Sequence, residues 1–178
     1  MLIPALALFL MSFQDEFDQR EQSRFDTEWR DVIAPDSSFK IRYPINPEID
    51  TRYIDLKFDT VRSVTISYDG EPIYGNVRYI VTYIDYPDSV IHSNYPYDLV
   101  QNFLDQAKEG SVKKAGGKIR TARQTHVDGY PARRVIVDYT NSAVLNAEFI
   151  LVKSRLYIIQ VLTPISFKFN AFKRKFID

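Results

Sequence analysis

The sequence predicts an α+β fold, in which a twisted and mainly antiparallel sheet is flanked by helices. Several stretches alternate apolar and polar residues with a period of two, which is typical of half-buried strands. Turn-forming residues separate most of these stretches at hairpin length. One stretch in the middle of the chain changes to helical spacing. The chain has 178 residues, of which 45% are hydrophobic and 14% aromatic, and this suffices for one domain with a core.

Four strands are expected before residue 87. They cover residues 39–43, 53–58, 61–68 and 76–86. Proline follows the first strand at Pro44 and the last at Pro87, and proline cannot donate a ladder hydrogen bond. Between the third and fourth strands, the run from Asp69 to Pro72 contains the glycine and proline of a tight turn. The sequence therefore predicts a hairpin at this run.

The central helix is expected to begin after Asn94 and to end at Gly110. Asn94 can cap the first turn, which tolerates Pro96, and Gly110 suits a left-handed exit. Helical spacing places five apolar side chains on one stripe: Leu99, Val100, Phe103, Leu104 and Ala107.

A second group of strands follows the helix. It covers residues 118–127, 132–139, 147–153 and 156–162. Turn residues separate these strands at 128–131, 140–142 and 154–155. Ser166 can then cap a short final helix, with Phe169, Phe172 and Phe176 on one side.

The N-terminal part divides into an apolar leader, residues 1–13, and a polar tether, residues 14–28, before a single domain at residues 29–178. The leader has no charged side chain and resembles the central region of a secretory signal, although it lacks a basic residue and an A-x-A site. It is too short for a stable membrane span. We expect export to the periplasm or the medium. The alternative is an apolar segment that packs on the domain.

Several stretches resemble a bacterial family of uncharacterised, exported domains with the PsbP/Mog1-like fold. They are Trp29, residues 39–44 (FKIRYP), 79–87 (YIVTYIDYP), the helix at 99–110, 128–133 (DGYPAR) and 154–157 (SRLY). The resemblance implies an α/β/α sandwich. It also implies an accessory or binding role, as in the PsbP subunits of photosystem II and the Ran-binding Mog1.

Charge is balanced overall but divided along the chain. The 23 Lys and Arg residues equal the 23 Asp and Glu residues, which argues against a dedicated nucleic-acid binder. Residues 14–110 hold 10 basic and 19 acidic side chains, whereas residues 111–178 hold 13 and 4. Whether this polarity survives folding depends on how the two parts of the chain are arranged in space.

Few residues suggest catalysis or metal binding. The chain has no Cys and two His, His92 and His126, and it has no G-x-S-x-G motif or zinc-site spacing. The carboxylates Asp85, Asp88 and Asp98 could gather around an oxygen-preferring ion, but solvated surface carboxylates are the favoured interpretation. We therefore expect no metal and no cofactor.

Two groups of residues are candidates for binding. Five basic residues, Lys118, Arg120, Arg123, Arg133 and Arg134, could form one patch for an anionic partner. The alternative is a solvated face that the acidic half balances. Tyr79 and Tyr83 share one strand face and could form an aromatic contact surface, or they could pack beneath a helix.

The sequence therefore predicts a non-enzymatic, exported binding or accessory domain, with a protein or another anionic partner and no nucleic acid. Two alternatives remain. One is a hydrolase that uses carboxylates or tyrosines which the sequence does not single out, and the other is a structural stabiliser of an envelope complex.

Overall fold

The structure is a computed structural model that describes residues 29–43, 46–56, 59–73, 76–139 and 143–167. The chain divides into two compact units, Met1–Asn46 and Pro47–Asp178, and each is described by itself. The expected leader, the tether and most of the final helix lie outside the described residues. A single domain over 29–178 stays a prediction. No helix in the described part of the chain has the length and apolar character needed to cross a membrane.

The described part of the first unit is a β-hairpin. Strands β1 (Arg30–Ile33) and β2 (Lys40–Tyr43) pair antiparallel, with Val32 opposite Ile41. In the connecting loop, the Asp36 carboxylate accepts hydrogen bonds from the backbone N–H and the hydroxyl of Ser38. The alternation at 39–43 correctly predicts β2, whereas β1 was not expected.

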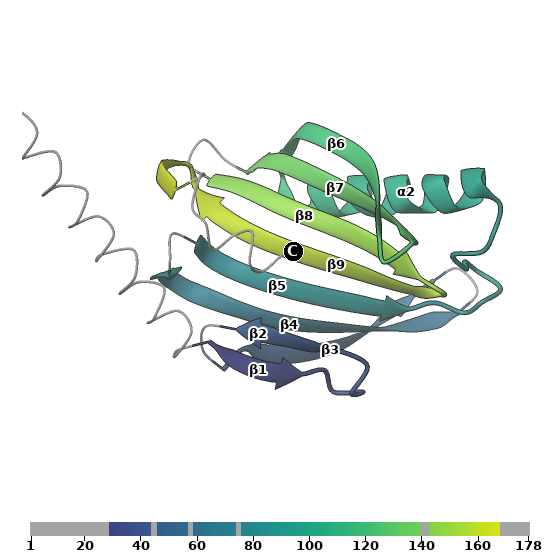
Figure 1. Ribbon diagram of the computed structural model, residues 1–178, viewed down its shortest axis with the longest axis horizontal. Helices are drawn as coiled ribbons and strands as arrows, with labels where there is room; N and C mark the ends of the chain where they lie inside the picture. The colour runs from purple at the N-terminus through teal and green to yellow at the C-terminus, as the bar shows by residue number, and fades with distance from the viewer. Residues whose placement is uncertain (1–28, 44–45, 57–58, 74–75, 140–142, 168–178) are drawn as a thin grey trace, which may run out of the picture. The chain divides into compact units, whose positions relative to one another are not determined.

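The second unit contains a seven-stranded antiparallel sheet in the order β3-β4-β5-β9-β8-β7-β6 (Figure 1). The strands are β3 (Glu48–Asp55), β4 (Thr60–Ile73), β5 (Asn76–Asp85), β6 (Lys118–Val127), β7 (Tyr130–Tyr139), β8 (Ala143–Val152) and β9 (Arg155–Pro164). Strands β3 and β6 are its two edges. The expected turn at Asp69–Pro72 is wrong, because β4 continues through it to Ile73 with a register shift.

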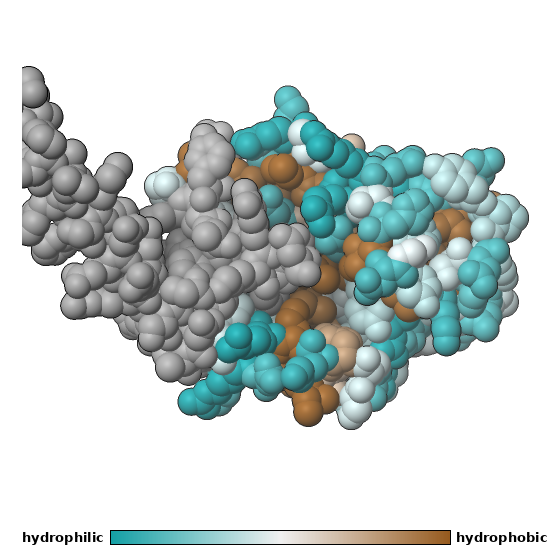
Figure 2. Space-filling model, viewed as in Figure 1, coloured by the Kyte–Doolittle hydropathy of each residue, from teal (hydrophilic) through white to brown (hydrophobic). Residues whose placement is uncertain are grey.

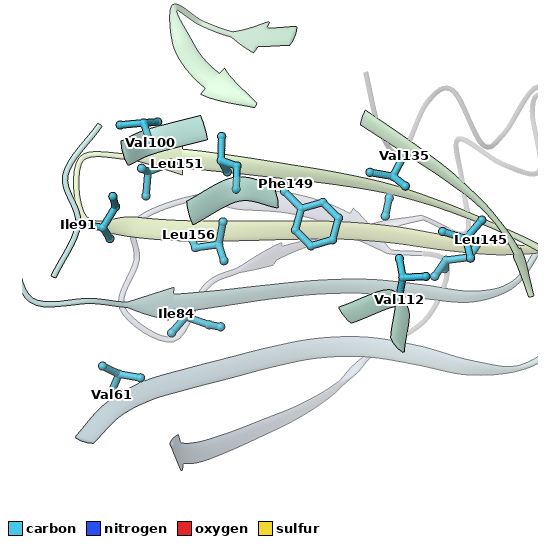
Figure 3. Packing of buried hydrophobic residues seen from close by; sticks show 13 residues of the cluster. Val61, Ile84, Ile91, Val100, Val112, Val135, Leu145, Phe149, Leu151 and Leu156 are labelled. Atoms are coloured by element: carbon cyan, nitrogen blue, oxygen red, sulfur yellow. The ribbon is translucent and has the colours of Figure 1, made fainter. Parts of the chain in front are cut away.

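Helix α2 (Tyr97–Ala115) packs against β7 and β8 on one face of the sheet, which we call the helix face. The core between them includes Phe149, Leu151 and Leu156 from the sheet and Val100, Leu104 and Val112 from α2 (Figure 3). The register places another row on the opposite face, the far face: Thr51, Val64, Tyr83, Tyr157, Ile150, Ala132 and Thr125.

The expected α/β/α sandwich is therefore wrong. The described residues are mainly strands, and within them α2 is the one α-helix and covers one face of the sheet. After β9, the described part of the chain forms only a short 3₁₀ turn, η1 (Ile165–Phe167). Strands β8 and β9 are also longer than the alternation indicated, because β8 already begins at Ala143 and β9 runs from Arg155 to Pro164.

Both ends of α2 differ from expectation. No side chain caps its first turn, and the backbone N–H of Asn94 donates to His92 Nδ1 instead. Gly110 lies inside the helix, which ends at Gly116 with φ 70°. Continuing the helix past Gly110 allows Val112 to reach the core, and glycine at Gly116 then adopts the left-handed conformation without steric cost.

Candidate binding site

The sheet order separates the two oppositely charged parts of the chain. The acidic part forms β3, β4 and β5, and the basic part forms β9, β8, β7 and β6, so the two parts do not interleave in the sheet. Edge strand β3 carries Glu48, Asp50 and Asp55 against Arg52. Edge strand β6 carries Lys118, Arg120 and Arg123 and no acidic residue. The charge polarity of the sequence therefore becomes a polarity across the sheet.

Four of the five predicted basic residues gather at one edge. We call Lys118, Arg120, Arg123 and Arg134 the basic edge. All four side chains are exposed, and the register puts Arg123 directly opposite Arg134 on the far face. Hydrophilic residues lie at the edge of the sheet over β6, with apolar residues beside them (Figure 2).

Two members of the basic edge are ion-paired. Arg120 donates to both carboxylate oxygens of Asp138 on β7. Arg134 donates to both oxygens of Glu148 on β8, at 3.3 Å each, and Glu148 is only 1% exposed. A buried carboxylate needs such a partner, so Arg134 has a structural role besides its exposure.

The side chains of Lys118 and Arg123 make no hydrogen bond or ion pair within the described part of the chain. Arg123 lies opposite Arg134 across the ladder, and the charge of Arg134 is already paired with Glu148. These two cations are therefore the accessible charge of the edge.

Arg133 is not part of the basic edge, although it is adjacent to Arg134 in sequence. Its side chain points to the helix face, is only 3% exposed, and donates from Nε and Nη2 to the two carboxylate oxygens of Asp105 on α2, at 3.0 and 3.2 Å. The hydrogen bond from Arg133 lowers the pKa of Asp105 from 3.8 to about 2; burial opposes this shift, and a hydrogen bond from Lys108 adds to it. Arg133 therefore anchors α2 to the sheet.

The predicted tyrosine pair is buried. Tyr79 and Tyr83 are both 0% exposed and lie on the far face, so they neither coat the surface nor pack against α2. Asn76 Nδ2 donates to the Tyr79 hydroxyl at 2.8 Å, and Arg62 Nη2 donates to the Tyr83 hydroxyl at 3.1 Å. Burial with satisfied hydroxyl groups indicates a packing role for both rings.

Two neighbouring residues were not singled out from the sequence. The guanidinium of Arg155 lies over the Tyr83 ring, 4.6 Å from its centroid, and donates to Asp85. On the other face, Tyr86 packs edge-on against Phe103 of α2, with ring centroids 5.1 Å apart, and burial raises the pKa of its hydroxyl. Tyr86 and Ile84 both pack in the core on the helix face.

The two sheet edges differ in regularity. Strand β6 has a register shift between Ile119 and Thr121 in its ladder with β7, so it is bulged. The β3 ladder with β4 runs without a shift from Glu48 to Asp55, and every residue of β3 is exposed. Alternation starting at Tyr53 predicted a half-buried strand here. The run from Ile49 to Tyr53 has apolar residues at its two ends and opposite charges next to them. This pattern is the sequence signal that could have identified β3 as an edge strand.

The carboxylates and histidines are dispersed. Within the described residues, no group of three or more His, Cys, Asp or Glu side chains could hold a metal ion. Asp88 accepts a hydrogen bond from the Ser154 hydroxyl, and Asp98 lies in the first turn of α2. His92 precedes α2, and His126 is exposed on β6.

Comparison with known proteins leaves the family undefined. No family model matches the chain, and no curated protein matches it. A crystal structure of PA94, a protein of unknown function from Pseudomonas aeruginosa, is similar with a TM-score of 0.39 and 11% sequence identity, over 79% of this chain and 85% of that one.

Proposed function

We propose that this protein is a non-enzymatic, exported binding domain whose basic edge holds an acidic segment of a partner protein. The observation that carries the proposal is the pair of exposed cations on edge strand β6, Lys118 and Arg123, which have no carboxylate partner in the described part of the chain. An acidic partner would supply the counter-charges that these two side chains lack in the described part of the chain.

The shape of the edge favours recognition by side chains. A bulge and basic residues are features that natural edge strands use against added strands, and β6 has both. The partner is therefore expected to contact the cationic side chains and not to extend the sheet at β6.

The charge distribution favours a protein over a long polyanion. The basic edge lies at one side of the sheet and the acidic residues of β3 lie at the other. Because a nucleic acid or an anionic membrane presents negative charge over a wide area, it would be repelled by the acidic side of the same sheet. A short acidic segment meets only the basic edge.

The exported location rests on the apolar residues 1–13, and the binding role rests on the exposed cations of the basic edge. The hydrolase alternative has no catalytic residue assigned to it. Both the location and the role are parts of the proposal.

The test is binding of a labelled oligoglutamate peptide, measured by fluorescence anisotropy at low and high salt. We expect salt-sensitive binding that weakens about fivefold in the variant K118Q/R123Q, because each exposed charge contact is worth about 0.5 kcal/mol. The matched control is K114Q/K153Q, which removes the same charge from two exposed lysines outside the basic edge.

Three outcomes would contradict the proposal. The first is the absence of peptide binding at low salt. The second is an equal loss of affinity in K118Q/R123Q and K114Q/K153Q, which would indicate a response to net charge alone. The third is tighter binding to anionic lipid vesicles than to the peptide, which would indicate a membrane surface instead.

A further inference from the structure

Strand β3 is an open edge of the sheet. It pairs with β4 on one side only, and no other strand in the described part of the chain pairs with its outer side. All its residues are exposed, including Tyr53 at 72% and Ile49 at 51%. A regular, uncovered edge strand is a template for pairing with another strand. The charged residues of β3 exclude strands that would place like charges opposite them, so they decide which strand can pair.

The β3 sequence is complementary to itself when it is reversed about Thr51. Ile49 and Tyr53 lie two residues to either side of Thr51 and are both apolar. Asp50 and Arg52 lie one residue to either side and have opposite charges. Strand alternation puts Ile49, Thr51 and Tyr53 on the far face and Asp50 and Arg52 on the helix face.

We propose that two copies of this chain pair through β3 in an antiparallel manner, with the twofold axis at Thr51. In this register Thr51 lies opposite Thr51 of the second copy. Asp50 of each copy lies opposite Arg52 of the other, and Ile49 opposite Tyr53. Each is a favourable cross-strand pair, and the sheet continues from one copy into the next.

Other registers of the same strand are less favourable. A twofold axis at Arg52 places Arg52 opposite its own copy, and an axis at Asp50 does the same for Asp50. An in-register parallel pairing would align every charged residue with its like. Within one chain, Arg52 Nε already bonds Asp50 Oδ2 at 2.6 Å on the exposed surface. The dimer would join two such pairs into one network of alternating charge.

A single pair of edge strands buries less surface than a standard stable interface, so the dimer is expected to be weak and concentration-dependent. Sedimentation velocity on the full chain, from about 1 μM to about 1 mM, should show a reversible monomer–dimer equilibrium. A monomer throughout this range would overturn the proposal.

Cysteine cross-linking tests the register, because the chain has no native Cys. Directly opposed residues of antiparallel strands have Cα atoms about 4.5–5.5 Å apart, which suits a disulfide. The variant T51C should therefore form disulfide-linked dimers under mild oxidation. The matched control is E48C on the same exposed strand, whose two copies would lie roughly 20 Å apart. Equal cross-linking of the two variants would contradict the register.

Exchanging the charges of Asp50 and Arg52 tests whether the partner strand is β3 of a second copy. The single variants D50R and R52D each place like charges opposite one another, and each should weaken dimerisation about tenfold. The double variant D50R/R52D restores opposite charges and should dimerise like the native chain. An equimolar mixture of D50R and R52D should form mixed dimers. Loss of dimerisation in the double variant, or no mixed dimers from folded single variants, would overturn the proposal.

Discussion

The bond between Arg133 and Asp105 is expected to hold α2 on the sheet, and Asp105→Asn tests this. The Arg133 side chain is 3% exposed and its guanidinium donates twice to the carboxylate. Asparagine keeps the size and one acceptor oxygen but removes the charge and one acceptor. The guanidinium then stays inside the helix–sheet interface without a counter-ion, which is unfavourable.

The lowered pKa of Asp105 gives the expected loss in the free energy of unfolding. A fall from 3.8 to about 2 corresponds to at most about 2 kcal/mol of stabilisation by the charged carboxylate. The Asp105 side chain is 40% exposed, so solvent screening reduces this to about 1 kcal/mol. Loss of one hydrogen bond to the buried Arg133 adds to the cost. We expect Asp105→Asn to lower the free energy of unfolding by about 1–2 kcal/mol at neutral pH.

Urea unfolding followed by far-UV circular dichroism measures this difference. The matched control is Glu109→Gln, which removes a charge from an exposed residue of the same helix whose ion pair with Lys108 spans 3.8 Å. The control should change stability by less than about 0.5 kcal/mol.

The difference in unfolding free energy between the native chain and Asp105→Asn should also depend on pH. The folded pKa of Asp105 lies below its unfolded value, so its contribution is present above about pH 4 and is lost as the pH falls through about 2. Native chain and Asp105→Asn should therefore converge in strong acid. Equal stabilities of Asp105→Asn and Glu109→Gln at neutral pH would refute the reasoning, as would a difference that persists unchanged at pH 2.

Two further predictions concern the end of α2 and the N-terminus. Gly110→Ala should stabilise the chain by about 0.5–1 kcal/mol in urea unfolding, because Gly110 lies inside the helix and an added Cβ meets no atom within 4 Å. Gly116→Ala should destabilise it by about 1 kcal/mol, because φ there is 70°. A loss of stability in Gly110→Ala together with a gain in Gly116→Ala would instead place the helix end at Gly110. Mass spectrometry of protein from its native cell should find an N-terminus between residues 12 and 16, whereas an intact Met1 would contradict leader cleavage.

Local patterns in the sequence were sufficient to locate most elements. Period-two alternation correctly placed β2, β5 and β6. The apolar stripe from Leu99 to Ala107 correctly placed the middle of α2, although Leu99 itself is 54% exposed and lies outside the core. These signals are local because a strand or helix needs one apolar face wherever it packs. The ends of elements are not decided locally: Asp69–Pro72 resembles a turn, yet pairing with β5 draws the start of this run into β4.

The candidate site shows more clearly what local sequence patterns do not predict. The basic residues from Lys118 to Arg134 were evident in the sequence, but neighbouring strand residues face opposite sides of the sheet, so Arg133 is buried against Asp105 whereas Arg134 is half exposed beside Glu148. Likewise, Tyr79 and Tyr83 were correctly placed on one strand face, but the burial of that face depends on what packs there.

The amino-acid sequence by itself determined that acidic residues precede basic ones along the chain. It did not determine whether those charges would mix in the folded protein. The tertiary structure decided this in two ways. Helix α2 brings Asp105 of the acidic part onto the basic strand β7, where it pairs with Arg133. Strand order nevertheless keeps the two edge strands apart, because β9 pairs with β5 and α2 connects β5 to the far edge strand β6. Because this crossover sends the chain to the opposite edge, the basic strand lies farthest from the acidic one, and a charge pattern along the chain becomes two chemically distinct edges.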